Sequence, residues 1–210
     1  MQWLEFENRD RASRYTAERL ADHLRGALSA NPGRVTVALS GGSTPQACYR
    51  MLANTDLEWQ RVDVTLTDER CVPATHTDSN TRMLHQHLFK DSAAQARFVS
   101  MHSFEQNPEV FNTVLLGMGA DGHFASLFPD ALNLNAALDL SGVDQLVQIK
   151  TASSPYVRLS LTLQRLLQTQ ALLLLVFGED KREVIRSCSD LPVEALLQQQ
   201  QIEPTVIWAP

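Results

Sequence analysis

The stretch VTVALSGGSTPQACYRML, residues 35–52, decides the fold. It begins with apolar and β-branched residues, which predict a strand buried on both faces, as in a parallel sheet. Small polar residues and a glycine pair follow, and the remainder has the spacing of an amphipathic helix. Thr44 is a good N-cap and Pro45 suits the first helical position. The stretch therefore predicts a strand, a tight loop and a helix, in that order.

The loop between the predicted strand and helix has two interpretations. It is either a plain turn or an anion site, because unpaired N–H groups and the positive end of the helix dipole meet there. The hydroxyls of Ser43 and Thr44 add donors, and Gly41 and Gly42 allow a ligand to approach the backbone. The loop lacks the lysine of a P-loop and the glycine spacing of a dinucleotide fingerprint. Its own chemistry leaves both interpretations open.

Similar apolar runs recur along the chain and alternate with helical patterns. The runs cover residues 35–39, 62–67, 113–119 and 171–177, and helical spacing appears within residues 15–28, 80–88, 161–167, 181–187 and 193–197. This alternation is typical of α/β proteins with a mainly parallel central sheet flanked by helices. The chain has 210 residues without a linker or an internal repeat, so we expect residues 1–210 to form one domain.

Composition limits the partners and the compartment. A net charge of −6 argues against broad binding to nucleic acid or to an anionic membrane. The longest apolar run, residues 171–177, is too short to span a bilayer, and the N-terminal residues do not read as a signal peptide. Cys48, Cys71 and Cys188 are odd in number and lie far apart, which indicates free thiols. We expect a cytoplasmic protein.

Charged residues follow the second apolar run. In TLTDERCVP, residues 65–73, Asp68, Glu69 and Arg70 stand where a strand is predicted to end, and open α/β sheets bind ligands on that side. The alternative is a solvated charged turn. The next segment, THTDSN at residues 75–80, predicts a polar loop and an N-cap.

The sharpest functional signal is LLGMGADGHFASLFP, residues 115–129. Three glycines, Gly117, Gly119 and Gly122, make a loop that is costly to order and suits close backbone approach. His123 is the side chain best suited to proton transfer near neutral pH, and Asp121 can orient it. The alternatives are a polar histidine in a turn and a zinc ligand. No second ligand stands at a zinc spacing, so we predict no metal.

Two basic residues complete the candidate set. Arg158 follows a turn-rich segment, and Lys181 falls in the first turn of a predicted helix after the run at residues 171–177. A cation at a helix N-terminus is unfavourable unless an anion joins it, which points to an anionic ligand. Salt bridges from Glu179 and Asp180 are the alternative explanation for Lys181.

Taken together, four motifs resemble the 6-phosphogluconolactonase family, which shares its fold with the glucosamine-6-phosphate deaminases. The motifs are SGGSTP at residues 40–45, TDER at 67–70, GMGADGH at 117–123 and GEDK at 178–181. The resemblance implies a three-layer Rossmann-like fold and hydrolysis of 6-phosphogluconolactone in the oxidative pentose phosphate pathway. It also implies a small sugar-phosphate lactone as partner and no metal or organic cofactor. We expect a monomer.

Two positions distinguish the chain from the deaminases. Arg70 stands where a deaminase typically has tyrosine, and Phe128 stands where a deaminase has its catalytic glutamate. Lactone hydrolysis needs one base for water and a stabilised oxyanion, whereas amine loss needs several acid and base groups. A deaminase-like isomerase and a non-catalytic sugar-phosphate sensor remain the alternatives.

The expected roles follow from this resemblance and from the residue chemistry. The substrate phosphate is expected on Gly41, Gly42, Ser43 and Thr44, with Arg158 and Lys181 as its cations. His123, oriented by Asp121, takes a proton from the attacking water. Arg70 or loop N–H groups stabilise the oxyanion, a choice the sequence leaves open. Asp68 is expected to hold Arg70 or a hydroxyl rather than to act as a base.

Overall fold

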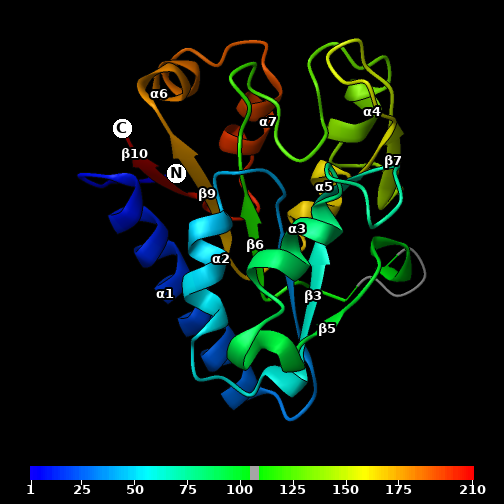
Figure 1. The fold of residues 1–210 in the computed structure, drawn as a ribbon. Coiled ribbons are helices and arrows are strands. Elements are labelled where there is room, and N and C mark those ends of the chain that lie inside the picture. Colours follow the sequence, from blue (N-terminus) through cyan, green and yellow to red (C-terminus); the bar gives the residue numbers. More distant parts are fainter. Residues whose placement is uncertain (105–108) are drawn as a thin grey trace.

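The computed structural model describes residues 1–104 and 109–210. Its centre is a seven-stranded sheet in which every neighbouring pair is parallel (Figure 1). In spatial order the strands are β1 (Gln2–Glu5), β10 (Thr205–Ala209), β9 (Leu172–Phe177), β6 (Thr113–Leu116), β2 (Val35–Leu39), β3 (Val62–Leu66) and β5 (Arg97–Phe98). The predicted α/β architecture with a mainly parallel central sheet is confirmed.

The central strands are apolar because both of their faces are covered. Every residue of β2, β3 and β6 is buried. The predicted runs were placed correctly, but the run at 113–119 was too long, since β6 ends at Leu116 and the glycines after it form a loop. The strands β1, β5 and β10 were not predicted. Both β1 and β5 are short and partly exposed, whereas β10 is an apolar run that is buried from Val206 to Ala209.

Helices fill the connections between the strands. They are α1 (Arg9–Ala30), α2 (Gln46–Ala53), α3 (Asn80–His87), α4 (Leu134–Leu138), α5 (Leu163–Leu166), α6 (Glu179–Arg186) and α7 (Pro192–Gln198), with short 3-10 turns at Trp59–Arg61, Asp91–Gln95 and Met101–Phe104. The long helix α1 buries an apolar stripe against β10, β9, β6 and β2 and also packs on α2. The helix predicted at 161–167 was wrong at its start, because Thr162 caps α5 and Leu161 ends a strand.

A second, antiparallel sheet was not predicted. It consists of β4 (Asp68–Arg70), β8 (Arg158–Leu161) and β7 (Leu146–Ile149). The Asp68–Arg70 segment was expected in a loop at a strand end, but it forms β4 and pairs with β8. The register places Arg70 opposite Arg158, so two guanidinium groups far apart in sequence start from neighbouring positions.

The order in which the chain adds strands to the sheet reverses between the parallel neighbours β2 and β6. From β2 the chain proceeds to β3 and β5 on one side, and from β6 it proceeds to β9 and β10 on the other side. The strands β2 and β6 pair in parallel, and just beyond β2 the Ser40 N–H donates to the Leu115 carbonyl at 3.0 Å. The loops leaving β2 and β6 therefore diverge and leave a crevice, which is where open α/β sheets bind ligands.

Two further predictions concern cysteines and membranes. Cys48, Cys71 and Cys188 are all free thiols, as predicted. Among residues 1–104 and 109–210, no helix has the length and apolar character needed to cross a bilayer.

Candidate functional site

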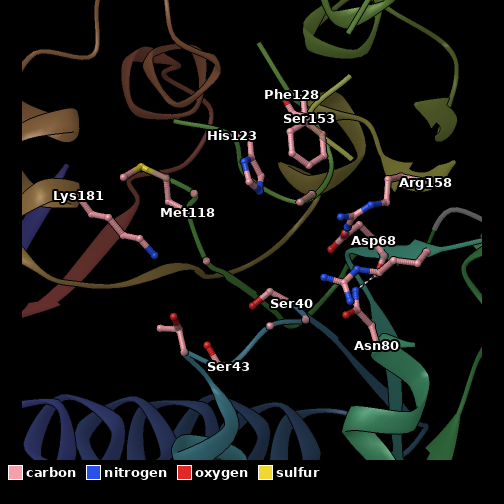
Figure 2. Close-up of a pocket in the computed structure, with 17 residues that line it drawn as sticks. Ser40, Ser43, Asp68, Asn80, Met118, His123, Phe128, Ser153, Arg158 and Lys181 are labelled. Carbon is pink, nitrogen blue, oxygen red and sulfur yellow. Dashed lines mark hydrogen bonds and ion pairs between the residues drawn. The ribbon is translucent and has the colours of Figure 1, made fainter. Parts of the chain in front are cut away.

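A cavity of about 360 Å³ lies in the crevice between the diverging loops (Figure 2). The predicted site residues line it with one exception, Asp121. Those that line it are Gly41, Gly42, Ser43, Thr44, Asp68, Arg70, His123, Arg158 and Lys181. They come from the ends of β2, β6 and β9 and from the second sheet, so the fold gathers segments that are distant in sequence.

The loop after β2, residues 40–45, presents backbone donors to the cavity. The N–H groups of residues 41–44 have no hydrogen-bond acceptor among the described residues. The prediction that Thr44 caps the helix was wrong: α2 begins at Gln46, with Pro45 in helical conformation at the cap position and no side-chain cap. The Thr44 hydroxyl is therefore left to the cavity wall rather than used by the helix.

Ser40, which begins this loop, and Asn80, which lies beside it, were not predicted as site residues. The Ser40 hydroxyl lines the cavity, is buried and has no partner among the described groups. Asn80 packs against Gly41, where an added Cβ would lie 2.0 Å from the Asn80 amide oxygen. Gly41 is thus required by the protein's own packing, which is a different reason from the ligand approach expected from the sequence. Gly42 has a φ of +88°, which glycine adopts readily.

The loop after β6 holds His123 against Asp121. The His123 Nδ1 lies 2.5 Å from an Asp121 carboxylate oxygen. Partial burial raises the pKa of Asp121, but the hydrogen bond and charge of His123 outweigh that effect, so its pKa lies below the usual value. An ionised Asp121 accepts from Nδ1–H, which leaves Nε2 of His123 for a ligand in the cavity.

Gly119 makes room for this pair. A Cβ on Gly119 would lie 2.3 Å from two atoms of the His123 ring and 2.5 Å from the Asp121 carboxylate. The Gly119 N–H also donates to the His123 carbonyl at 2.9 Å, which closes the loop. The close approach inferred from the three glycines is therefore, at Gly119, the approach of the protein's own histidine.

Phe128 links the histidine to a cation. Its buried ring lies 4.1 Å from the His123 ring, centroid to centroid, with 30° between the planes. The Arg158 guanidinium carbon lies 5.5 Å from the centre of the same ring. Figure 2 shows Phe128 beside His123 at the edge of the cavity. One aromatic side chain thus contacts both groups.

The Asp68 carboxylate contacts Ser126 and Arg158 at the wall of the cavity. Its carboxylate accepts from the Ser126 hydroxyl at 2.5 Å and lies 3.7 Å from Arg158 Nη1. The expected contact of Asp68 with Arg70 is wrong, since its arginine partner is Arg158, and its expected contact with a hydroxyl of a ligand stays a prediction. Burial and the nearby Arg70 lower the pKa of Arg158, and Asp68 opposes that shift.

The positive charges face one another across the cavity. The Arg70 guanidinium donates to the Asp78 carbonyl, which fixes it on the same side as Arg158. Lys181 approaches from the start of α6 on the other side, in the first helical turn as predicted. No described carboxylate lies within 4.0 Å of Lys181, and Glu179 pairs with Arg182 instead. The salt-bridge explanation for Lys181 is therefore wrong for both Glu179 and Asp180.

The arrangement has the chemistry of a site for an anionic ligand. Three cations and one buried carboxylate leave an excess of positive charge for a dianion. Within the described ranges, no group of three His, Cys, Asp or Glu side chains is placed to hold a metal ion. Ser153 also lines the cavity, from a turn that is hydrogen-bonded to Asp130, and no sequence signal marked it.

Comparisons with known proteins agree on one family. The family described as glucosamine-6-phosphate isomerases/6-phosphogluconolactonase matches residues 7–110 and 100–208. A curated 6-phosphogluconolactonase of Caulobacter vibrioides is 40% identical over 90% of this chain and 90% of its own length. One of Neisseria meningitidis serogroup A is 34% identical over 99% of this chain and 98% of its own length.

Solved structures agree with the sequence relatives. A 6-phosphogluconolactonase from Shewanella baltica has a TM-score of 0.93 at 28% identity and covers 100% of this chain and 98% of that chain. A monomeric glucosamine-6-phosphate deaminase has a TM-score of 0.79 at 20% identity, with 100% of this chain and 97% of that chain covered. The second likeness shows the shared fold alone.

The space at Gly119 can be tested directly. In Gly119→Ala the added methyl group displaces the His123 ring, so the bond to Asp121 opens and the pKa of Asp121 rises. The carboxylate, which stays ionised to low pH in the unmodified protein, then takes up its proton at a higher pH. NMR titration of the Asp121 carboxyl carbon measures this change. Gly26→Ala, where a Cβ would meet nothing within 4 Å, is the control and leaves the titration unchanged. An unaltered titration in Gly119→Ala would contradict the steric argument.

Proposed function

The chain belongs to the glucosamine-6-phosphate isomerase/6-phosphogluconolactonase family, and from that premise we propose that it hydrolyses 6-phospho-D-glucono-1,5-lactone to 6-phospho-D-gluconate, in the oxidative pentose phosphate pathway. Identity of 34–40% to curated lactonases over nearly their full length supports this activity. The observation that carries it is the placement of His123, hydrogen-bonded to Asp121, in one cavity with the loop after β2 and three cations. Residues 1–210 act as a single catalytic domain.

The phosphate of the substrate binds at the loop after β2. Unpaired N–H groups of residues 41–44, the Ser43 and Thr44 hydroxyls and the Lys181 ammonium converge there. A phosphate dianion accepts several such hydrogen bonds at once, and the start of α2 adds a favourable dipole. Arg158 supplies a further positive charge from the second sheet. These contacts with the phosphate orient the lactone ring of the substrate toward His123.

His123 acts as the general base. Its Nε2 takes a proton from water as the water oxygen attacks the lactone carbonyl, while Nδ1–H remains bonded to ionised Asp121. The carbonyl oxygen becomes a tetrahedral oxyanion, which Arg70 or loop N–H groups stabilise. When the intermediate collapses, the ring oxygen leaves and receives the proton from His123. Water and lactone are thus converted to the acid without any other reactant.

Phe128 argues against the deaminase alternative. The position that carries the catalytic glutamate in the deaminase pattern holds an apolar ring, which packs on His123 and cannot transfer a proton. The sensor alternative requires neither His123 nor Asp121, yet the two are hydrogen-bonded at the cavity. A monomeric state, a cytoplasmic location and independence from cofactors and nucleic acid stay predictions.

The lactonase activity and its base are tested together. Freshly prepared lactone should release protons faster with the protein than without it, and 6-phosphogluconate dehydrogenase should capture the product. His123→Asn should lower kcat by at least about 10²-fold, the typical contribution of a general base, with KM nearly unchanged. Ammonia release from glucosamine 6-phosphate, or full activity in His123→Asn, would contradict the assignment.

The phosphate grip makes a separate prediction. Lys181→Ala and Arg158→Ala each remove one cation that faces the dianion, so KM should rise about 10-fold or more, as for a lost charge-assisted hydrogen bond. The effect on kcat should be smaller, because these side chains contact the remote end of the substrate. Arg11→Ala, an exposed cation outside the cavity, is the control. An unchanged KM in both variants would place the phosphate elsewhere.

Replacing the aromatic ring of Phe128 tests its contact with His123. Phe128→Leu removes the ring that lies against His123, so kcat should fall about 10-fold or more as the base loses its position. Phe128→Tyr keeps the ring and should retain most of the rate. Phe111→Leu truncates another buried phenylalanine outside the cavity and controls for lost core packing. Equal losses of kcat in Phe128→Leu and Phe111→Leu would mean that the ring acts only through stability.

A further inference from the structure

A second cavity shares a wall with the catalytic one. Its volume is about 520 Å³, and it is bounded by the starts of α1, α2 and α6 and the end of β9. Ser43, Thr44 and Lys181 line both cavities. Figure 2 shows Ser43 between the catalytic cavity and the blue helix α1. The three shared residues therefore separate an inner cavity from an outer one.

The outer cavity has an excess of positive charge. Arg9, Arg50 and Lys181 line it, and its one lining carboxylate, Asp10, lies 3.4 Å from Arg14. Arg9 donates through Nε to the Pro210 oxygen, and one nitrogen of Arg50 lies 3.1 Å from His87. The other guanidinium nitrogens of Arg9 and Arg50 have no hydrogen-bond partner among the described residues. They remain available to an anion in the cavity.

A buried hydroxyl provides an independent indication of a ligand. Ser13 lines the outer cavity and is 1% exposed, yet its Oγ has no hydrogen-bond partner among the described residues. An unpartnered buried hydroxyl is costly, so such groups are usually satisfied by something that binds. The hydroxyls of Ser43 and Thr44 on the shared wall also lack a protein partner in the described ranges. Hydroxyls and cations together suit an acceptor with several oxygens.

We propose that the outer cavity is a second phosphate subsite, which binds inorganic phosphate or the phosphate group of a small monoester other than the lactone. A phosphate dianion matches the charge of three cations better than a ligand with a single carboxylate group does. The volume exceeds what a lone ion requires, and Phe177 adds an apolar wall for the organic part of an ester. The proposal rests on the proposed function in one respect, namely that the inner cavity binds the phosphate of the substrate.

Lys181 couples the two subsites. A single ammonium group between two dianions is shared, so occupancy of the outer subsite weakens the grip on the phosphate of the lactone. The coupling is reciprocal, since two ligands that compete for one cation lower each other's affinity. The outer phosphate does not contact His123, so it raises KM and leaves kcat unchanged. The structure thereby gives the enzyme a means of responding to the concentration of phosphate compounds.

A ³¹P NMR titration with inorganic phosphate tests the site itself. The unmodified protein should bind two equivalents, and Arg9→Gln/Arg50→Gln should bind one. Arg11→Gln/Arg25→Gln, which removes two exposed cations outside the outer cavity, should still bind two. The same titration with glycerol 2-phosphate distinguishes the sources, because tighter binding of either compound at the outer subsite identifies it as the preferred ligand. Two equivalents in Arg9→Gln/Arg50→Gln would overturn the proposal.

Kinetics test the coupling. Because the outer phosphate weakens binding of the lactone and of the inner phosphate alike, the apparent KM for lactone should rise most steeply at low phosphate concentration and then approach the slope of Arg9→Gln/Arg50→Gln, in which it rises linearly with the same kcat. The same linear rise, with the same slope, in both proteins would overturn the coupling. The phosphate titration distinguishes failure of this proposal from failure of the proposed function. If one equivalent of phosphate binds, survives Arg158→Ala and is lost in Arg9→Gln/Arg50→Gln, the outer subsite exists and the inner one does not. If the one equivalent is lost only in Arg158→Ala, the inner subsite exists and the outer one does not.

Discussion

The parallel pairing of β2 with β6 at the centre of the sheet is the constraint on which the site depends. Their register is fixed by burial, since shifting either strand by one residue would exchange the side chains on its two covered faces. Because the chain continues in opposite directions from these two strands, their loops must diverge. The loop after β2 and the loop that holds His123 therefore face one crevice.

Steric room, rather than backbone flexibility alone, explains the glycines that the site depends on most. Gly41 gives space to Asn80, and Gly119 gives space to the His123 ring and the Asp121 carboxylate. In both places a side chain that completes the cavity occupies the volume that a Cβ would need. The histidine is then confined from three directions, by Gly119, by Asp121 and by the ring of Phe128. If His123 is the base, as we propose, a side chain held in this way needs little reorganisation for catalysis.

The positive charges of the site stand on two sides of the cavity. Lys181 and the loop after β2 lie on one side of the cavity, while Arg70 and Arg158 project from the second sheet on the other. Asp68 and Ser126 compensate for the burial of Arg158, which would otherwise be costly. No described carboxylate lies within 4.0 Å of Lys181, which also lines the outer cavity. Lys181 is thus the described cation that the two cavities have in common.

The sequence by itself determined the parallel sheet, the strand–loop–helix units and most of the site, because buried strands need continuous apolar runs and phosphate loops and proton transfer need particular residue types. It placed His123 with Asp121 because they are two residues apart. It could not reveal the pairing of β4 with β8, since that contact joins residues almost ninety positions apart through three-residue to four-residue strands. The partnership of Asp68 with Arg158, the roles of Ser40 and Asn80, and the cavity beyond Lys181 were decided by tertiary structure, because each depends on which distant segments share the crevice.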